Sequence, residues 1–122
     1  MVLDKRQFHR VRFTAISELI NNNITYRGQL ENISLNGALV SFSDGVIVPQ
    51  DDECILSVFL EGEDTPLRFV VKVIYSNFTM IGIKFVSEDT ETRERLYNIL
   101  ARLSTEKQKL AYERKALEKE RE

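Results

Sequence analysis

Short runs rich in β-branched and aromatic residues alternate with turn-forming residues along the chain from Phe13 to about Val86. Such runs favour extended backbone, and the Gly, Pro, Asn and Asp residues between them favour turns. We therefore expect six strands, which are Thr14–Ile20, Thr25–Ile33, Ala38–Phe42, Ile55–Leu60, Leu67–Tyr75 and Thr79–Val86. An open sheet of six short strands would leave unpaired edges and an uncovered face. The pattern thus predicts a mainly β fold, a six-stranded antiparallel β-barrel that is closed or nearly closed.

Two of the expected turns have residues that suit a tight change of direction. The run Asn21–Asn23 tolerates left-handed backbone and is typical of a hairpin tip. The turn Ser34–Gly37 ends in glycine, just before the third expected strand. Consecutive strands are therefore expected to pair antiparallel to one another.

The last part of the chain has a different composition. From Asp89 it lacks Gly and Pro and is rich in Glu, Lys, Arg, Leu and Ala, which predicts one long helix. At 1.5 Å per residue this helix would span roughly 50 Å. Its first part has an apolar stripe at helical spacing, which consists of Leu96, Ile99, Leu100 and Leu103. We expect this stripe to cover one mouth of the barrel rather than a partner.

A seven-residue repeat of leucine runs through the same segment. It comprises Leu96, Leu103, Leu110 and Leu117, whereas charged residues such as Glu106 and Glu113 interrupt the remaining apolar positions. A coiled coil that makes the protein a homo-oligomer and a solvated helix or disordered tail both remain open. We therefore divide the chain into a basic N-terminal arm (1–13), a barrel (14–88) and a C-terminal helix (89–122).

Charge and composition exclude several classes of function. The formal net charge is −2 and the pI is about 5.5, so binding to long nucleic acids is not expected. The single cysteine, Cys54, forms no internal disulfide or thiolate zinc site. The chain lacks a secretory signal and any apolar stretch of the roughly 20 residues that cross a bilayer. We expect a cytoplasmic protein without a membrane span.

Catalytic residues are scarce. The only histidine, His9, has no carboxylate or cysteine partner nearby in the sequence, and neither a nucleophile motif, a phosphate loop nor a metal-ligand cluster occurs. We therefore expect no enzyme activity, no metal and no cofactor.

Two short motifs point to a ligand. The segment Arg6–Arg10 has arginines four residues apart, and Asn32–Gly37 reads Asn-x-Ser-x-x-Gly. In this order, and with six strands, they resemble the PilZ domain family, whose pattern is Arg-x-x-x-Arg on an N-terminal arm followed by Asp/Asn-x-Ser-x-x-Gly. The segment Gly82–Phe85 is similar to a late strand of that family. The chain resembles a stand-alone PilZ protein with a C-terminal helix.

The resemblance implies a receptor for the bacterial second messenger cyclic di-GMP. Its expected ligand-binding residues are Arg6, Arg10, Asn32, Ser34 and Gly37. Guanidinium groups can fork onto guanine, pair with phosphate or stack on a purine. Many family members have a further arginine where this chain has Lys5, which keeps the charge but stacks less well. Ligand stoichiometry therefore stays open.

Each residue of the second motif has an expected role. Asn32 offers an acceptor to the N–H groups of guanine. Ser34 either contacts the ligand, which we favour, or caps its own turn. Gly37 supplies a positive φ angle or room for a close approach.

Three candidate functions follow from these features. The leading one is a cyclic di-GMP receptor that orders its arm on binding and signals in trans to an unidentified protein effector. The main alternative is a PilZ-like interaction module that binds no nucleotide. A barrel for single-stranded nucleic acid would need exposed aromatic residues among basic ones, and Phe69, Phe78 and Phe85 look like core instead.

Overall fold

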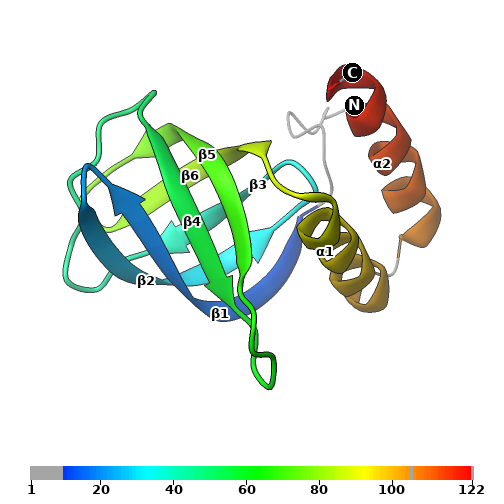
Figure 1. Cartoon of the computed structure of the whole chain (residues 1–122), viewed down its shortest axis with the longest axis horizontal. Coiled ribbons are helices and arrows are strands. Elements are labelled where there is room, and N and C mark those ends of the chain that lie inside the picture. Colours follow the sequence, from blue (N-terminus) through cyan, green and yellow to red (C-terminus); the bar gives the residue numbers. More distant parts are fainter. Residues whose placement is uncertain (1–9, 105, 122) are drawn as a thin grey trace, which may run out of the picture.

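A closed barrel and two helices make up the computed structural model, which describes residues 10–104 and 106–121 (Figure 1). The strands are β1 (Val11–Asn21), β2 (Ile24–Ile33), β3 (Gly37–Ser41), β4 (Glu53–Phe59), β5 (Leu67–Ser76) and β6 (Met80–Ser87). Their order around the barrel is β1-β2-β3-β6-β5-β4, and β1 pairs with β4 to close it. All neighbours are antiparallel. The six predicted strands and the antiparallel barrel are therefore confirmed.

The predicted ends of the strands differ from the observed ones by a few residues. The largest difference is at β1, which begins at Val11 and so includes the last three residues of the predicted arm. At the other end of β1, Asn22 and Asn23 have φ angles of 51° and 67°, and Asn21 pairs with Ile24. Two left-handed residues match the twist of the flanking strands. The predicted Asn hairpin tip is confirmed.

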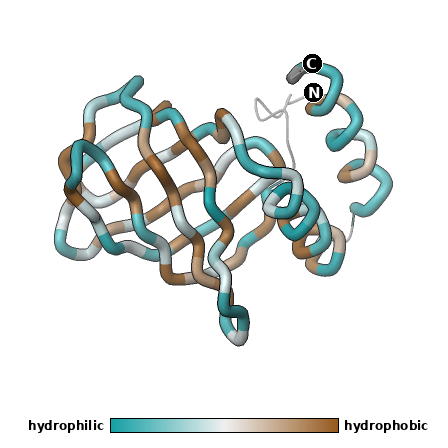
Figure 2. Tube along the Cα trace, in the orientation of Figure 1, coloured by the Kyte–Doolittle hydropathy of each residue, from teal (hydrophilic) through white to brown (hydrophobic). Residues whose placement is uncertain are grey.

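Alternate residues of the strands fill the inside of the barrel, as the banding of hydropathy in Figure 2 illustrates. At its centre the rings of Phe69 and Phe85 are stacked, with centroids 4.0 Å apart and planes at 10°. Phe78, which we expected in the core, is 64% exposed, because it lies in the turn between β5 and β6. There its ring covers Gly45, where a Cβ atom would collide with it.

The C-terminal segment forms two helices, α1 (Thr90–Leu103) and α2 (Lys107–Arg121). The prediction of one continuous helix was wrong. Ser104 ends α1 in an extended conformation, with φ −83° and ψ 140°, and its N–H still donates to the carbonyl of Leu100. The hydroxyl of Ser104 accepts the backbone N–H of Glu106 at 3.0 Å. Ser104 thus satisfies backbone groups at the end of one helix and at the start of the next.

Both helices bury leucines against the rest of the chain. In α1, Leu96, Ile99 and Leu100 are buried, whereas Leu103 is 42% exposed. Helix α1 packs against β5, which confirms the prediction that its apolar stripe covers the barrel. Of the later heptad leucines, Leu110 and Leu117 of α2 are buried within the chain. The described part of the chain therefore uses three of the four heptad leucines internally. Self-association through this segment stays a prediction.

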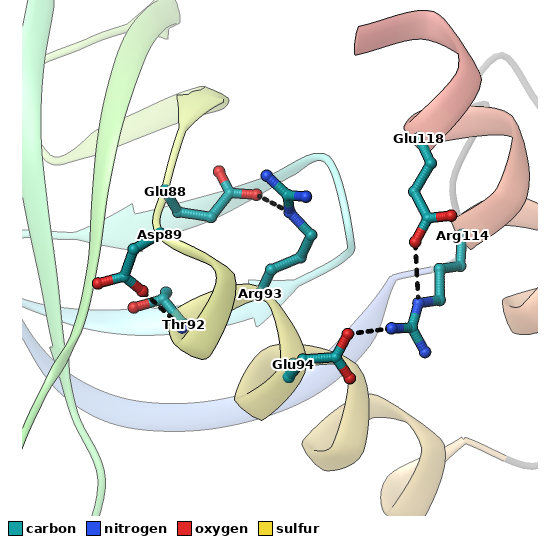
Figure 3. Close-up of polar contacts among 7 residues, drawn as sticks. All are labelled: Glu88, Asp89, Thr92, Arg93, Glu94, Arg114 and Glu118. Atoms are coloured by element: carbon teal, nitrogen blue, oxygen red, sulfur yellow. Dashed lines mark hydrogen bonds and ion pairs between the residues drawn. The ribbon is translucent and has the colours of Figure 1, made fainter. Parts of the chain in front are cut away.

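Arg114 of α2 interacts with side chains of α1. Its guanidinium forms ion pairs with Glu94 of α1 and with Glu118 of α2, as Figure 3 shows. It also lies over the ring of Tyr97, 4.2 Å from the centroid. A cation that is shared between two carboxylates and an aromatic face holds the two helices side by side.

Asp89 caps the N-terminus of α1, and its loss is expected to lower the melting temperature. Its carboxylate accepts the backbone N–H of Thr92 at 2.7 Å (Figure 3), and this hydrogen bond lowers the pKa of Asp89 below its usual 3.8. The cap therefore stabilises the fold above about pH 4 and is lost as the pH falls through the lowered pKa. Asp89→Ala should melt a few degrees lower at pH 7, and the difference should shrink on acidification. Thermal unfolding between pH 2.5 and 7 measures this, with Asp89→Asn as the control that caps at every pH.

Candidate ligand site

The two predicted motifs meet at the start of β1. Arg10 immediately precedes β1, and its Nη1 donates to Oδ1 of Asn32 on β2 at 3.3 Å. The pairing of Arg12 with Asn32 between β1 and β2 brings these strand ends together. Residues 22 positions apart in the sequence thus lie within hydrogen-bonding distance, and both are half-buried.

A shallow cavity of about 340 Å³ lies at this contact. Its lining consists of Arg10, Arg12, Glu31, Asn32, Leu39 and Met80. The carboxylate of Glu31 accepts the hydroxyl of Ser41 at 2.6 Å. The two guanidiniums and the amide can bind anionic and hydrogen-bonding groups, while the two apolar side chains can contact a flat ring.

Ser34 is 4% exposed, and its hydroxyl forms hydrogen bonds inside its own turn. It accepts the backbone N–H groups of Asn36 at 3.1 Å and Gly37 at 3.2 Å. The backbone N–H of Ser34 donates to the carbonyl of Gly37 at 2.8 Å. These contacts are those of the turn-capping role that we set beside ligand contact. Contact between Ser34 and a ligand stays a prediction.

Gly37 begins β3 opposite Lys84 of β6. Its φ angle is not positive, so that part of the prediction was wrong. A Cβ atom at this position would instead collide with the backbone carbonyl oxygen of Ile83. Glycine is therefore needed here because the backbones of β3 and β6 approach closely, the other role that we considered.

Arg6 and Lys5, the remaining predicted ligand residues, lie outside the described residues, as does His9. Arg12, Leu39 and Met80 line the cavity although the sequence did not single them out as ligand residues. Arg12 carried a usable signal, because it follows the arginine motif by two residues in the sequence. Leu39 and Met80 reach the site only through the pairing of β2, β3 and β6.

The turn of the second motif also faces helix α2. Leu35 lines a cavity of about 320 Å³ together with residues of α1 and α2. Asn36 and Lys84 line another, of about 270 Å³, and Leu117 of α2 lines both. The Asn32–Gly37 segment thus lies between the cavity lined by Arg10 and Arg12 and the C-terminal helices.

The only cysteine, Cys54, lies away from this cavity, on β4. Burial raises the pKa of the Cys54 thiol, which accepts a hydrogen bond from Asn21 inside the barrel. Within residues 10–104 and 106–121, no three His, Cys, Asp or Glu side chains form a group that could hold a metal ion. A helix long and apolar enough to cross a bilayer is likewise not found in this part of the chain.

Comparison with known sequences identifies one family. The PilZ domain matches residues 4–102, which is most of the chain. Among curated proteins, no significant match is found.

Solved structures share the fold at low sequence identity. The PilZ domain of YcgR from Escherichia coli, solved with c-di-GMP, has a TM-score of 0.69 and 16% identity, covering 95% of this chain and 97% of that one. The motility inhibitor MotI/DgrA of Bacillus subtilis has a TM-score of 0.67 and 18% identity over 82% of this chain. This chain spans about half of MotI/DgrA, namely 51%. The PilZ domain of CeSA from a cellulose-synthesising bacterium has a TM-score of 0.60 and 19% identity, covering 75% and 93%.

Proposed function

The chain belongs to the PilZ domain family, and from this premise we propose that it is a cytoplasmic receptor that binds cyclic di-GMP and signals to a protein partner. PilZ domains are non-enzymatic receptor modules, and family members such as YcgR bind this dinucleotide. The observation that carries the proposal is the hydrogen bond between Arg10 and Asn32 beside the 340 Å³ cavity. This hydrogen bond connects the Arg6–Arg10 motif with the Asn32–Gly37 motif, whose combination resembles the PilZ pattern.

The chemistry of the cavity suits the ligand. Cyclic di-GMP has two phosphates, which Arg10 and Arg12 can neutralise, and two guanines, whose edges a guanidinium or the Asn32 amide can bind. Arg6 would add a further guanidinium from the arm. Ser34 and Gly37 would act chiefly by fixing the turn that holds Asn32 in place.

Binding would change the shape of the protein through the arm. The guanidinium of Arg10 donates to the side chain of Asn32. A phosphate or guanine is a stronger or better-aligned acceptor for the same group, so the ligand would replace this contact. The arm and the Ser34–Gly37 turn would then move together. Helix α2 lies next to this turn, because Leu35 and residues of α2 line the same cavity. A partner protein that contacts the surface around α2 would then detect ligand binding.

A titration of the full chain with cyclic di-GMP tests the proposal directly. Isothermal calorimetry should give saturable heat with cyclic di-GMP and none with GTP at the same concentration, because GTP has a single base and an unrestrained triphosphate. The stoichiometry distinguishes one ligand from a stacked pair. If the protein shows neither heat nor a thermal shift at millimolar cyclic di-GMP, the ligand-independent interaction module is the better description.

A further inference from the structure

The end of the barrel away from the helices has exposed apolar side chains. The β1–β2 hairpin, the β3–β4 loop and the β5–β6 turn all lie at this end (Figure 1). Each of these segments contributes one large apolar residue to the surface, since Ile24 is 53% exposed, Ile47 77% and Phe78 64%. Apolar side chains that gather on one part of a surface indicate a contact with another molecule, whereas scattered ones do not.

Hydrogen bonds hold the three segments next to one another. The backbone N–H of Val46 donates to the carbonyl of Phe78 at 2.8 Å, and the hydroxyl of Tyr26 on β2 donates to the carbonyl of Ile47 at 3.2 Å. Val46 and Val48 are buried on either side of Ile47. The loop therefore cannot turn the Ile47 side chain inward without exposing both valines. The exposure of Ile47 is thus a fixed feature of the fold.

The same end of the barrel is acidic. Residues 28–67 include eight acidic residues and no lysine, arginine or histidine. Four of the eight lie in the β3–β4 loop or at the start of β4, namely Asp44, Asp51, Asp52 and Glu53. Lys72 of β5 offsets one of these charges through an exposed pair with Asp51 at 3.8 Å. We call these four residues, together with Ile24, Ile47 and Phe78, the acidic end.

Helix α2 presents a basic face to solvent. Leu110, Glu113 and Leu117 are buried, which fixes the side of α2 that faces the rest of the chain. At about 3.6 residues per turn, a different set of residues lies on the other side. This set consists of Gln108, Lys109, Tyr112, Lys115, Ala116 and Lys119, all of them exposed. We call it the lysine face, and Tyr112 at its centre is 76% exposed.

The three acidic residues of α2 point elsewhere. Glu113 is buried, and Glu118 forms an ion pair with Arg114. Glu120 lines the 270 Å³ cavity beside Asn36. The lysine face is therefore positively charged around one aromatic ring, whereas the acidic end is negatively charged around apolar side chains.

We propose that the protein associates head to tail, with the lysine face of one copy docked on the acidic end of a second copy. Tyr112 would lie against Ile47 and Phe78, while Lys115 and Lys119 would approach the acidic residues of the loop. The two surfaces differ and lie at opposite ends of the molecule (Figure 1), so each added copy offers a surface for the next. This contact goes beyond the proposed receptor function and does not depend on it.

The association should be weak and sensitive to salt. Helix α2 has 15 residues and is about 22 Å long, so one of its faces covers less than the roughly 800 Å² per partner of a stable interface. Exposed charges act over about 10 Å at 0.1 M ionic strength and over about 3 Å at 1 M. Sedimentation velocity at low salt should therefore show a mass that rises with protein concentration above the 14.2 kDa of one copy. At about 1 M salt the mass should return toward that of one copy.

Two variants each remove one of the two surfaces. Ile47→Lys places a cation in the acidic end, and Lys115→Glu/Lys119→Glu reverses the charge of the lysine face. Either variant alone should stay at the mass of one copy at every concentration. An equal mixture should form a dimer and nothing larger, because each variant keeps the surface that the other has lost. Formation of this dimer would also show that both variants are folded.

Matched controls change the same kinds of residue at other places. Ile16→Lys replaces an isoleucine of β1 that is 50% exposed, and Arg102→Glu reverses an exposed cation of α1. Both should associate as wild type does. Wild type that keeps the mass of one copy at millimolar concentration would overturn the proposal, as would association that neither surface variant reduces. A mixture of the two variants that forms no dimer, while wild type associates, would rule out a head-to-tail contact. These outcomes leave the calorimetric test of ligand binding unaffected.

Discussion

Arg10→Ala is expected to bind cyclic di-GMP roughly 10-fold to 150-fold more weakly than wild type, the loss that follows from about 1.5–3 kcal/mol per charge-assisted hydrogen bond. Arg10 is the described arginine that contacts Asn32 and lines the cavity, so its guanidinium is placed to bind the ligand. The affinity of Arg10→Lys for cyclic di-GMP should lie between those of wild type and Arg10→Ala, since lysine keeps the charge but cannot form two parallel hydrogen bonds from one planar group. The double variant Arg6→Ala/Arg10→Ala should lose measurable binding.

Calorimetric titration measures the loss, and thermal unfolding checks that the barrel remains folded. The matched control is Arg27→Ala, which removes an exposed arginine from β2, the strand that also bears Asn32. It should bind as wild type does, because loss of a distant charge is screened at ordinary salt. Equal affinities for wild type and Arg10→Ala would show that Arg10 has no role in capturing this ligand.

Gly37→Ala is expected to destabilise the fold by roughly 3 kcal/mol, the upper end for overpacking a tight site. The added methyl group collides with the carbonyl oxygen of Ile83, which belongs to a paired strand and cannot move like a flexible side chain. For a chain of this size the melting temperature should fall by about 12 °C. The shift of β3 would also displace the adjoining turn, so ligand affinity should fall with it.

Gly62→Ala provides the comparison for this prediction. Gly62 has a φ angle of 80°, but a Cβ atom there would meet nothing within 4 Å. Alanine at this site should therefore cost about 1 kcal/mol through backbone strain and leave ligand binding unchanged. Thermal unfolding of both variants separates strain from collision, and a Gly37→Ala variant as stable as Gly62→Ala would mean that β3 and β6 can separate easily.

The barrel was predictable because its strands carry local signals. Asn22 and Asn23 mark the first hairpin, and β-branched runs bounded by turn residues mark the strands. The motif residues Arg10 and Asn32 were identified because their motifs resemble the PilZ pattern, and the structure brings them into contact. Phe78 was misplaced because its hydrophobicity suggested the core, whereas its place in a turn decides its exposure.

The break between the helices and the full lining of the site were not predicted. The absence of Gly and Pro suggested one helix, but Ser104 interrupts it without either, by pairing its own backbone and hydroxyl with both helices. Leu39 and Met80 reach the cavity through the pairing of β2, β3 and β6. Such long-range pairing depends on how strands align across the barrel, which is not encoded in the local pattern around any one of them.

The closure of the barrel limits how another protein can recognise this one. Each of the six described strands has a neighbour on both sides, so its backbone groups are already taken up along the paired stretches. Recognition by strand addition, in which a partner's extended segment joins a sheet edge, therefore has no long edge to use here. An effector would have to dock on side chains of the outer face or of the two helices, and its specificity would then be set by individual surface residues that can be exchanged without disturbing the barrel.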